Sequence, residues 1–184
     1  MAATIGTYEI GPTNASLKLC TTKAGLGARL AHDLILEADA WSGSIVFDDS
    51  NMAASSVEVT VAAASLAVVD SSGGVKPLSD GDRREIASNI NDKALLTAEY
   101  PDITFRSTAI SGQSGAFTVT GDLTIKGMTR PINLAVTVDD DDHATVRATV
   151  VQTHFGIKPY SAMLGALKIS DAVEVRAVVS LPAS

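Results

Sequence analysis

The chain has 184 residues and a formal net charge of −7; 46% of its residues are hydrophobic, 19% charged and 4% aromatic. This composition is typical of one compact globular domain, which we place at residues 1–184, and it excludes a fibrous or largely disordered chain. Because nucleic acid and anionic membranes attract clustered positive charge, we expect no nucleic-acid partner for so acidic a protein.

The beginning of the sequence and its single cysteine bear on the compartment. "MAATIGTYEIGPTNASLKL" lacks the basic start and the apolar run of a signal peptide. No stretch reaches about 18 consecutive apolar residues, so we expect no integral membrane segment. Cys20 has no partner for an internal disulfide, which fits a reducing compartment. The expectation is a cytoplasmic protein, or a periplasmic or secreted one if a leader has been removed.

Apolar and polar residues alternate along most of the chain, which predicts β-strands with one apolar face. The first such stretches are "ASLKLCTTKA" at 15–24 and "LILEADAWSGSIVFDDS" at 34–50, the second with an expected bend at Gly43. Further on, the apolar positions are Val57, Val59 and Val61; Ile103 and Phe105; Val146, Ala148 and Val150; and Val173, Val175, Ala177 and Val179.

One segment between these strands has helical periodicity instead. Ser79 and Asp82 have the spacing of a capping box, and Ile86, Ile90 and Ala94 follow at intervals of four. This pattern predicts a helix at about 80–95, which would cover or plug one end of a barrel.

The stretch "VTGDLTIKGMTRPINLAVTV" at 119–138 predicts a hairpin whose turn contains Gly127. Its apolar phase continues from Phe117 through Val119 and Leu123, and resumes at Leu134 and Val136. Gly121 interrupts the large side chains, and two explanations stay open: a bend in the wall, or room for a ligand. Since the other connections are also short, we expect an all-β antiparallel barrel of about eight strands, with one or two short helices.

Several polar motifs bear on catalysis or metal binding. His32 and Asp33 are adjacent and would point to opposite sides of a strand, and His154 is far from both in the sequence. Ser114 lacks the second glycine of a nucleophile elbow, and the run of aspartates at 139–142 lacks the alternating spacing of a calcium loop. We therefore expect no metal, no cofactor and no enzymatic activity.

Four segments of the chain resemble the YceI-like family. They are "FDDSNMAASSVEVTV", "LLTAEYPDITFRST", "VTGDLTIKGMTRPINLAVTV" and "HFGIKPYSAMLGALKISDAVEVRAVV", in that order. The segment "GLGARLAHDLIL" looks like a variant of the family in this region, with Gly25, His32 and Asp33 in a short connection. The resemblance implies a lipocalin-like barrel that encloses a polyisoprenoid or a similar long lipid, and it implies no catalytic residues.

Two sets of candidate ligand-binding residues follow from the inward phase and from this resemblance. The barrel lining comprises Val59, Val61, Phe105, Phe117, Val119, Gly121, Leu123, Leu134, Val136, Ala148, Val150, Val175 and Ala177. The rim comprises Trp41, Phe155, Lys158, Tyr160, Met163 and Leu164. An apolar phase also fits a core filled by side chains, and the rim residues also fit an ordered surface loop.

The predicted function is therefore to bind and carry or sequester a long apolar lipid: a polyisoprenoid, an isoprenoid quinone or a fatty-acyl chain. The alternative is a scaffold or stress-response interaction protein with a filled core and no ligand. The sequence leaves a homodimer open in either case.

Overall fold

Eleven antiparallel strands form one curled sheet in the computed structural model of the chain, which describes residues 6–48, 50–113, 115–139 and 143–180. Their order in the sheet is β1-β5-β6-β8-β9-β10-β11-β14-β2-β4-β7. The bounds are β1 Gly6–Ile10, β2 Ala15–Thr21, β4 His32–Ala38, β5 Trp41–Phe47, β6 Ser56–Ala62, β7 Leu66–Gly73, β8 Asp102–Gln113, β9 Ala116–Ile125, β10 Met128–Val138, β11 His143–Val151 and β14 Ala172–Ser180.

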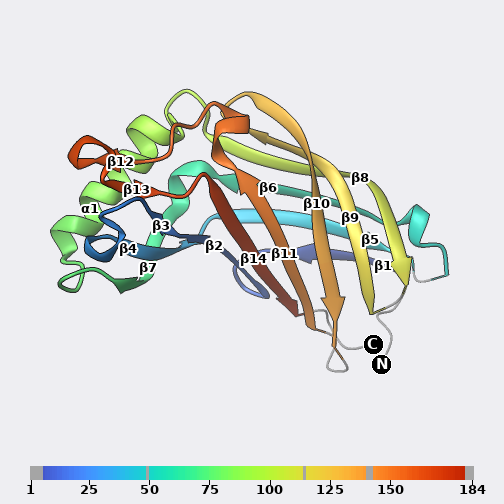
Figure 1. Cartoon of the computed structure of the whole chain (residues 1–184). Helices are drawn as coiled ribbons and strands as arrows, with labels where there is room; N and C mark the ends of the chain where they lie inside the picture. Colours follow the sequence, from blue (N-terminus) through green and yellow to red (C-terminus); the bar gives the residue numbers. More distant parts are fainter. Residues whose placement is uncertain (1–5, 49, 114, 140–142, 181–184) are drawn as a thin grey trace.

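A second, small sheet has the order β12-β13-β3, with bounds β12 Ser161–Ala162, β13 Leu167–Ile169 and β3 Lys23–Ala24. Short 3-10 turns lie at Ala28–Leu30, Met52–Ala54, Ala63–Ser65, Gln152–Phe155 and Met163–Gly165. Figure 1 shows the long strands β8, β9, β10, β11 and β14 side by side as a curved wall, with helix α1, β12 and β13 gathered at one end.

The antiparallel all-β fold is confirmed, but the expected count of about eight strands is not. Part of the difference in strand number arises because two long stretches of alternating residues are each interrupted and form two strands. Asp39 and Ala40 separate β4 from β5, and the turn Ala63–Ser65 separates β6 from β7. Since β4 pairs with β7 and β5 pairs with β6, both interruptions fall at the same level of the wall.

The run expected to bend at Gly43 is interrupted earlier in the sequence, at Asp39 and Ala40. Gly43 lies within β5, where it pairs with Ile10 of β1 and Val59 of β6. A Cβ atom at this position would lie 2.8 Å from the Glu58 carbonyl oxygen and 3.0 Å from side-chain atoms of both partners. The glycine therefore permits close packing of three neighbouring strands.

The predicted hairpin is confirmed in strands β9 and β10. Leu134 pairs with Val119 and Val136 with Phe117, so the apolar phases of the two strands share one face. The turn consists of Lys126 and Gly127, with φ of 53° and 71°. Two successive positive φ values characterise the tight turns that match the twist of paired strands.

The predicted helix is confirmed as α1, Asp80–Asn89, which continues as a π-helical turn through Ile90–Ala94. The Asp82 N–H donates to Ser79 Oγ at 3.2 Å, and the Ser79 N–H donates to Asp82 Oδ2 at 2.8 Å. This is the capping box that the sequence predicts, with aspartate in the usual place of glutamate. Within the described ranges, no helix is both long and apolar enough to span a membrane.

Candidate ligand-binding site

The curled sheet surrounds a cavity of about 1520 Å³. All eleven strands of the large sheet contribute side chains to its lining, and α1 contributes from one end. The lining is mainly apolar because each strand turns its apolar phase inward; β6, for example, presents Val57, Val59 and Val61. The alternation that builds the sheet thus also builds an apolar chamber.

Twelve of the thirteen residues predicted to line a barrel border this cavity. They are Val59, Val61, Phe105, Phe117, Val119, Leu123, Leu134, Val136, Ala148, Val150, Val175 and Ala177.

The thirteenth, Gly121, does not border the cavity. A Cβ there would lie 2.5 Å from the Arg106 carbonyl oxygen and 2.6 Å from Phe105 Cε2. The Phe105 ring lies over Gly121, so the glycine makes room for a neighbouring side chain and not for a ligand.

The prediction missed further lining residues on the strands and on the helix. Among them are Leu17 and Leu19 of β2, Leu34 and Leu36 of β4, Ile45 of β5, and Ile86 and Ile90 of the helical segment. The same period-two alternation marks the strand residues, and the spacing of four marks the helical ones. Both signals are present in the sequence.

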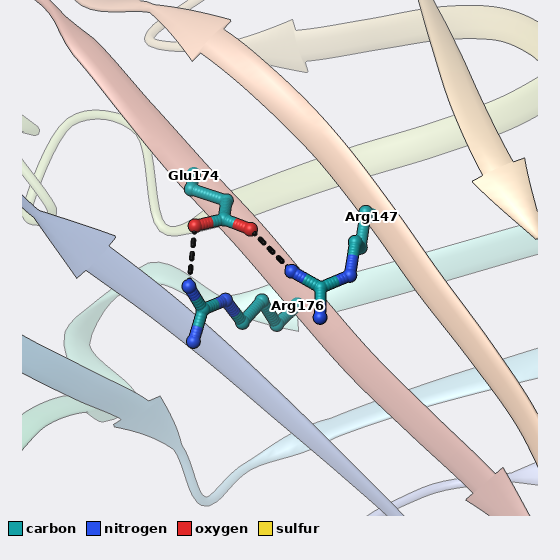
Figure 2. Close-up of polar contacts among 3 residues, drawn as sticks. All are labelled: Arg147, Glu174 and Arg176. Carbon is teal, nitrogen blue, oxygen red and sulfur yellow. Dashed lines mark hydrogen bonds and ion pairs between the residues drawn. The ribbon is translucent and has the colours of Figure 1, made fainter.

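Charged side chains occupy the outer face of the wall. Glu174 of β14 accepts from Arg147 Nη1 at 2.9 Å and from Arg176 Nη2 at 2.6 Å, and Figure 2 shows the carboxylate between the two guanidinium groups. The bonds from Arg176 and Arg147 hold the pKa of Glu174 below its ordinary value. Val173, Val175 and Ala177, at the intervening positions of the strand, line the cavity.

One end of the cavity is bordered by loop residues and by α1, and many of these residues are exposed; we call this end the mouth. It consists of lining residues from the loops 30–32 and 75–78, from α1 and from the segment 157–169. Of the predicted rim residues, Lys158, Tyr160 and Leu164 border the cavity here, and all three are exposed. At the opposite end, Val46 and Asp139 are the exposed lining residues.

The other three rim predictions have different outcomes. Trp41 borders the cavity and is only 9% exposed. It is the first residue of β5 and pairs with Val61, so its side chain shares the inner face of the sheet with this lining residue. Phe155 does not border the cavity and is 1% exposed within the hydrophobic core, so its placement at the rim is wrong. Met163 also does not border the cavity, because its side chain lies on the outer surface of the loop, 64% exposed.

Polar contacts fix the loops at the mouth. His32 borders the cavity, and its Nε2 atom hydrogen-bonds to the Lys76 carbonyl oxygen at 2.8 Å. Asp33 is engaged elsewhere: it accepts from the Lys23 N–H at 2.7 Å and forms an ion pair with Lys23 Nζ at 3.3 Å. Asp82 borders the mouth, and its pKa is lowered by the hydrogen bonds from the Ser79 hydroxyl and backbone N–H.

The described residues contain no group of three or more His, Cys, Asp or Glu side chains arranged to hold a metal ion. His32 lies at the mouth, whereas His154 lies in the turn after β11 and does not line the cavity. Ser114 and the aspartates 140–142 lie outside the described residues.

Fold and site together define the class: a β-protein whose antiparallel sheet curls around a large apolar cavity. Residues 8–181 match the family model described as a YceI-like domain, so the chain belongs to the YceI-like family.

Curated relatives match about half of the chain. Over 95 residues it is 32% identical to Protein YceI of Escherichia coli O157:H7 and 33% identical to a UPF0312 protein of Photorhabdus laumondii. In both cases the matched region is 51% of this chain and 43% of the relative.

Solved structures share the fold at low sequence identity. The crystal structure of BcnA from Burkholderia cenocepacia matches with a TM-score of 0.68 and 18% identity, over 90% of this chain and 94% of that one. A mutant CJ YCEI protein matches with a TM-score of 0.51 and 18% identity, over 81% of this chain and 84% of that one.

Proposed function

We propose that this protein binds a long apolar lipid in its cavity and carries or sequesters it without catalysing a reaction. The lipid is a polyisoprenoid, an isoprenoid quinone or a fatty-acyl chain. The observation that carries the proposal is the cavity of about 1520 Å³ with its apolar lining. It exceeds the range of roughly 300–1,000 Å³ that is usual for small-molecule pockets.

The size of the cavity argues against the alternative of a scaffold with a filled core. The space is bordered by exposed residues at both ends, so it is continuous with solvent and holds either water or a ligand. A lipid would remove the apolar lining from water, which solvent cannot do.

The chain length of the ligand follows from the balance between burial and association. Each buried methylene contributes about 0.8 kcal/mol, while association costs roughly 4–15 kcal/mol. A tail of about eight carbons gains roughly 6 kcal/mol and hardly exceeds this cost, whereas one of about twenty carbons gains roughly 16 kcal/mol. We therefore propose a ligand of about twenty carbons or more.

Trp41 offers a direct assay, since it is the single tryptophan of the chain and borders the cavity. Delipidated protein is titrated with isoprenoid quinones or fatty acids of increasing chain length while the Trp41 fluorescence is followed. The expected result is a saturable change in fluorescence whose midpoint falls as the chain lengthens. A Trp41→Phe variant should lose the signal but retain the lipid in native mass spectrometry.

A matched pair of variants separates cavity binding from surface adsorption. Ala148→Leu combined with Ala177→Leu adds side-chain volume inside the cavity, whereas Ala135→Leu adds the same group at an exposed position of β10. The inner double variant should weaken binding of the longest ligands, and the outer variant should not. No fluorescence change with any chain length, together with no lipid retained after purification, would refute the proposal.

A further inference from the structure

Large apolar side chains are exposed on the loops around the mouth. The exposed fractions are 103% for Leu26, 109% for Leu164, 80% for Val75 and 64% for Met163. Scattered exposed apolar residues are ordinary on protein surfaces, but a group of them rimmed by polar residues marks a contact surface. These four belong to three loops that are distant in the sequence.

Hydrogen bonds and strand pairing bring the three loops together. The Gly27 N–H donates to the Ala166 carbonyl oxygen at 2.8 Å, and β3 pairs with β13. The hydrogen bond between His32 and the Lys76 carbonyl joins the third loop to the first. Figure 1 shows β3, β12 and β13 at the same end of the molecule as α1. We call the outer surface of residues 25–31, 74–76 and 158–168 the mouth face.

The tip of one loop holds its apolar side chains outward in an unusual conformation. Met163 and Leu164 have φ of 50° and 55°, a left-handed region that residues with bulky side chains rarely adopt. Such strain persists only where the surrounding structure enforces it, and it is concentrated at functional sites. The loop thus keeps two apolar side chains in solvent at a conformational cost.

The mouth face is also cationic, although the whole chain has a net charge of −7. Its segments 25–31, 74–76 and 158–168 carry four Lys or Arg residues and no carboxylate, a local charge of +4. Lys23 and Asp33, just outside these segments, pair with each other. The four cations of the mouth face are exposed and, within the part of the chain that the structure describes, form no ion pair; they are Arg29, Lys76, Lys158 and Lys168. The adjacent helical segment 80–94 is nearly balanced, with four carboxylates and three cations.

We propose that the mouth face docks on the surface of an anionic lipid bilayer. The exposed apolar tips insert among the lipids, and the four cations lie against the phosphate groups. The local charge decides this encounter, because charges farther away than about 8–10 Å are largely screened at physiological salt. In this orientation the cavity opens toward the bilayer, which gives a lipid cargo a route that avoids water.

The test is co-sedimentation with vesicles of phosphatidylcholine, with and without phosphatidylglycerol. We expect binding to the vesicles with phosphatidylglycerol and a decrease of that binding with salt. The double variant Leu26→Gln/Met163→Gln should reduce the partition coefficient by at least about tenfold, since full burial of one large apolar side chain corresponds to roughly that factor. Arg29→Gln should reduce it about fivefold.

Leu26, Arg29 and Met163 do not line the cavity, so docking and cavity binding can be measured separately. The three substitutions should leave the Trp41 response to detergent-dispersed lipid unchanged. The matched controls are Val178→Gln and Arg130→Gln, which remove an exposed apolar group and an exposed cation outside the mouth face. Both should bind vesicles like the wild type.

Three results would overturn the docking proposal while leaving the carrier function intact. The first is wild-type protein that takes up lipid but does not sediment with anionic vesicles. The second is variants that sediment with the vesicles as the wild type does. The third is a wild-type homodimer in sedimentation velocity that Leu26→Gln/Met163→Gln converts to monomer, without vesicle binding by either form. The mouth face would then be a surface between two copies of the chain.

Discussion

Replacing Gly121 by alanine tests whether this glycine serves the wall or the ligand. The new Cβ would lie 2.5 Å from the Arg106 carbonyl oxygen and 2.6 Å from Phe105 Cε2, both closer than real Cβ contacts. The ring can move toward the cavity, but the carbonyl belongs to the ladder in which Ser107 pairs with Gly121, next to a bulge. Overpacking of this kind costs about 1–3 kcal/mol, and we expect the upper half of that range because backbone must shift.

A loss of about 2–3 kcal/mol corresponds to a decrease in the melting temperature of roughly 4–12 °C for a chain of this size. Thermal and urea unfolding of delipidated Gly121→Ala should show it. A double-mutant cycle with Phe105→Leu should recover the part that is due to the ring. If Gly121→Ala instead leaves the stability within about 0.5 kcal/mol of wild type and weakens lipid binding, the glycine provides ligand clearance and our reasoning is wrong.

Three further substitutions have expected outcomes. Ser79→Ala removes the hydroxyl of the capping box and should lower the free energy of unfolding by about 1 kcal/mol, measured in urea. Glu174→Gln should lower the free energy of unfolding by less than about 1 kcal/mol near neutral pH. The pKa of Glu174 is lower in the folded protein than its ordinary value of 4.5. The difference in stability between variant and wild type is therefore fully present above pH 4.5 and should vanish as the pH falls through the folded pKa. Leu164→Gly removes the cost of a leucine in the left-handed backbone conformation, about 1–2 kcal/mol, and adds an entropic cost of roughly 0.5–1 kcal/mol for the glycine. Urea unfolding should therefore show a small gain in stability. Vesicle binding should decrease, because the exposed leucine side chain is lost.

Short-range patterns in the sequence predicted those features of the fold that short-range physics determines. The turn at Gly127 and the helix start at Ser79 each depend on residues within a few positions, and both are confirmed. The wall residues depend on period two alone, because a strand that buries one face must alternate. For this reason the alternation alone predicts the cavity lining well on β6, β9 and β14.

Features that depend on partners distant in the sequence were not predictable in the same way. Gly43 is required by contacts with Ile10, Glu58 and Val59, and Gly121 by the Phe105 ring, so both glycines looked like bends or gaps in the sequence. Phe155 and Met163 are both apolar residues near the same loop. Long-range packing alone decides that the first is buried in the core and the second exposed.

The same alternation serves a filled core and a cavity wall, so the sequence could not separate them; the course of the strands does. A small β-barrel is just wide enough for its side chains to fill it or for one small ligand, so the outcome depends on how the sheet curls. Here the curled sheet surrounds a cavity of about 1520 Å³. Because a ligand that binds only the folded state stabilises it, lipid in the cavity would contribute to the stability of the fold as well as being its cargo.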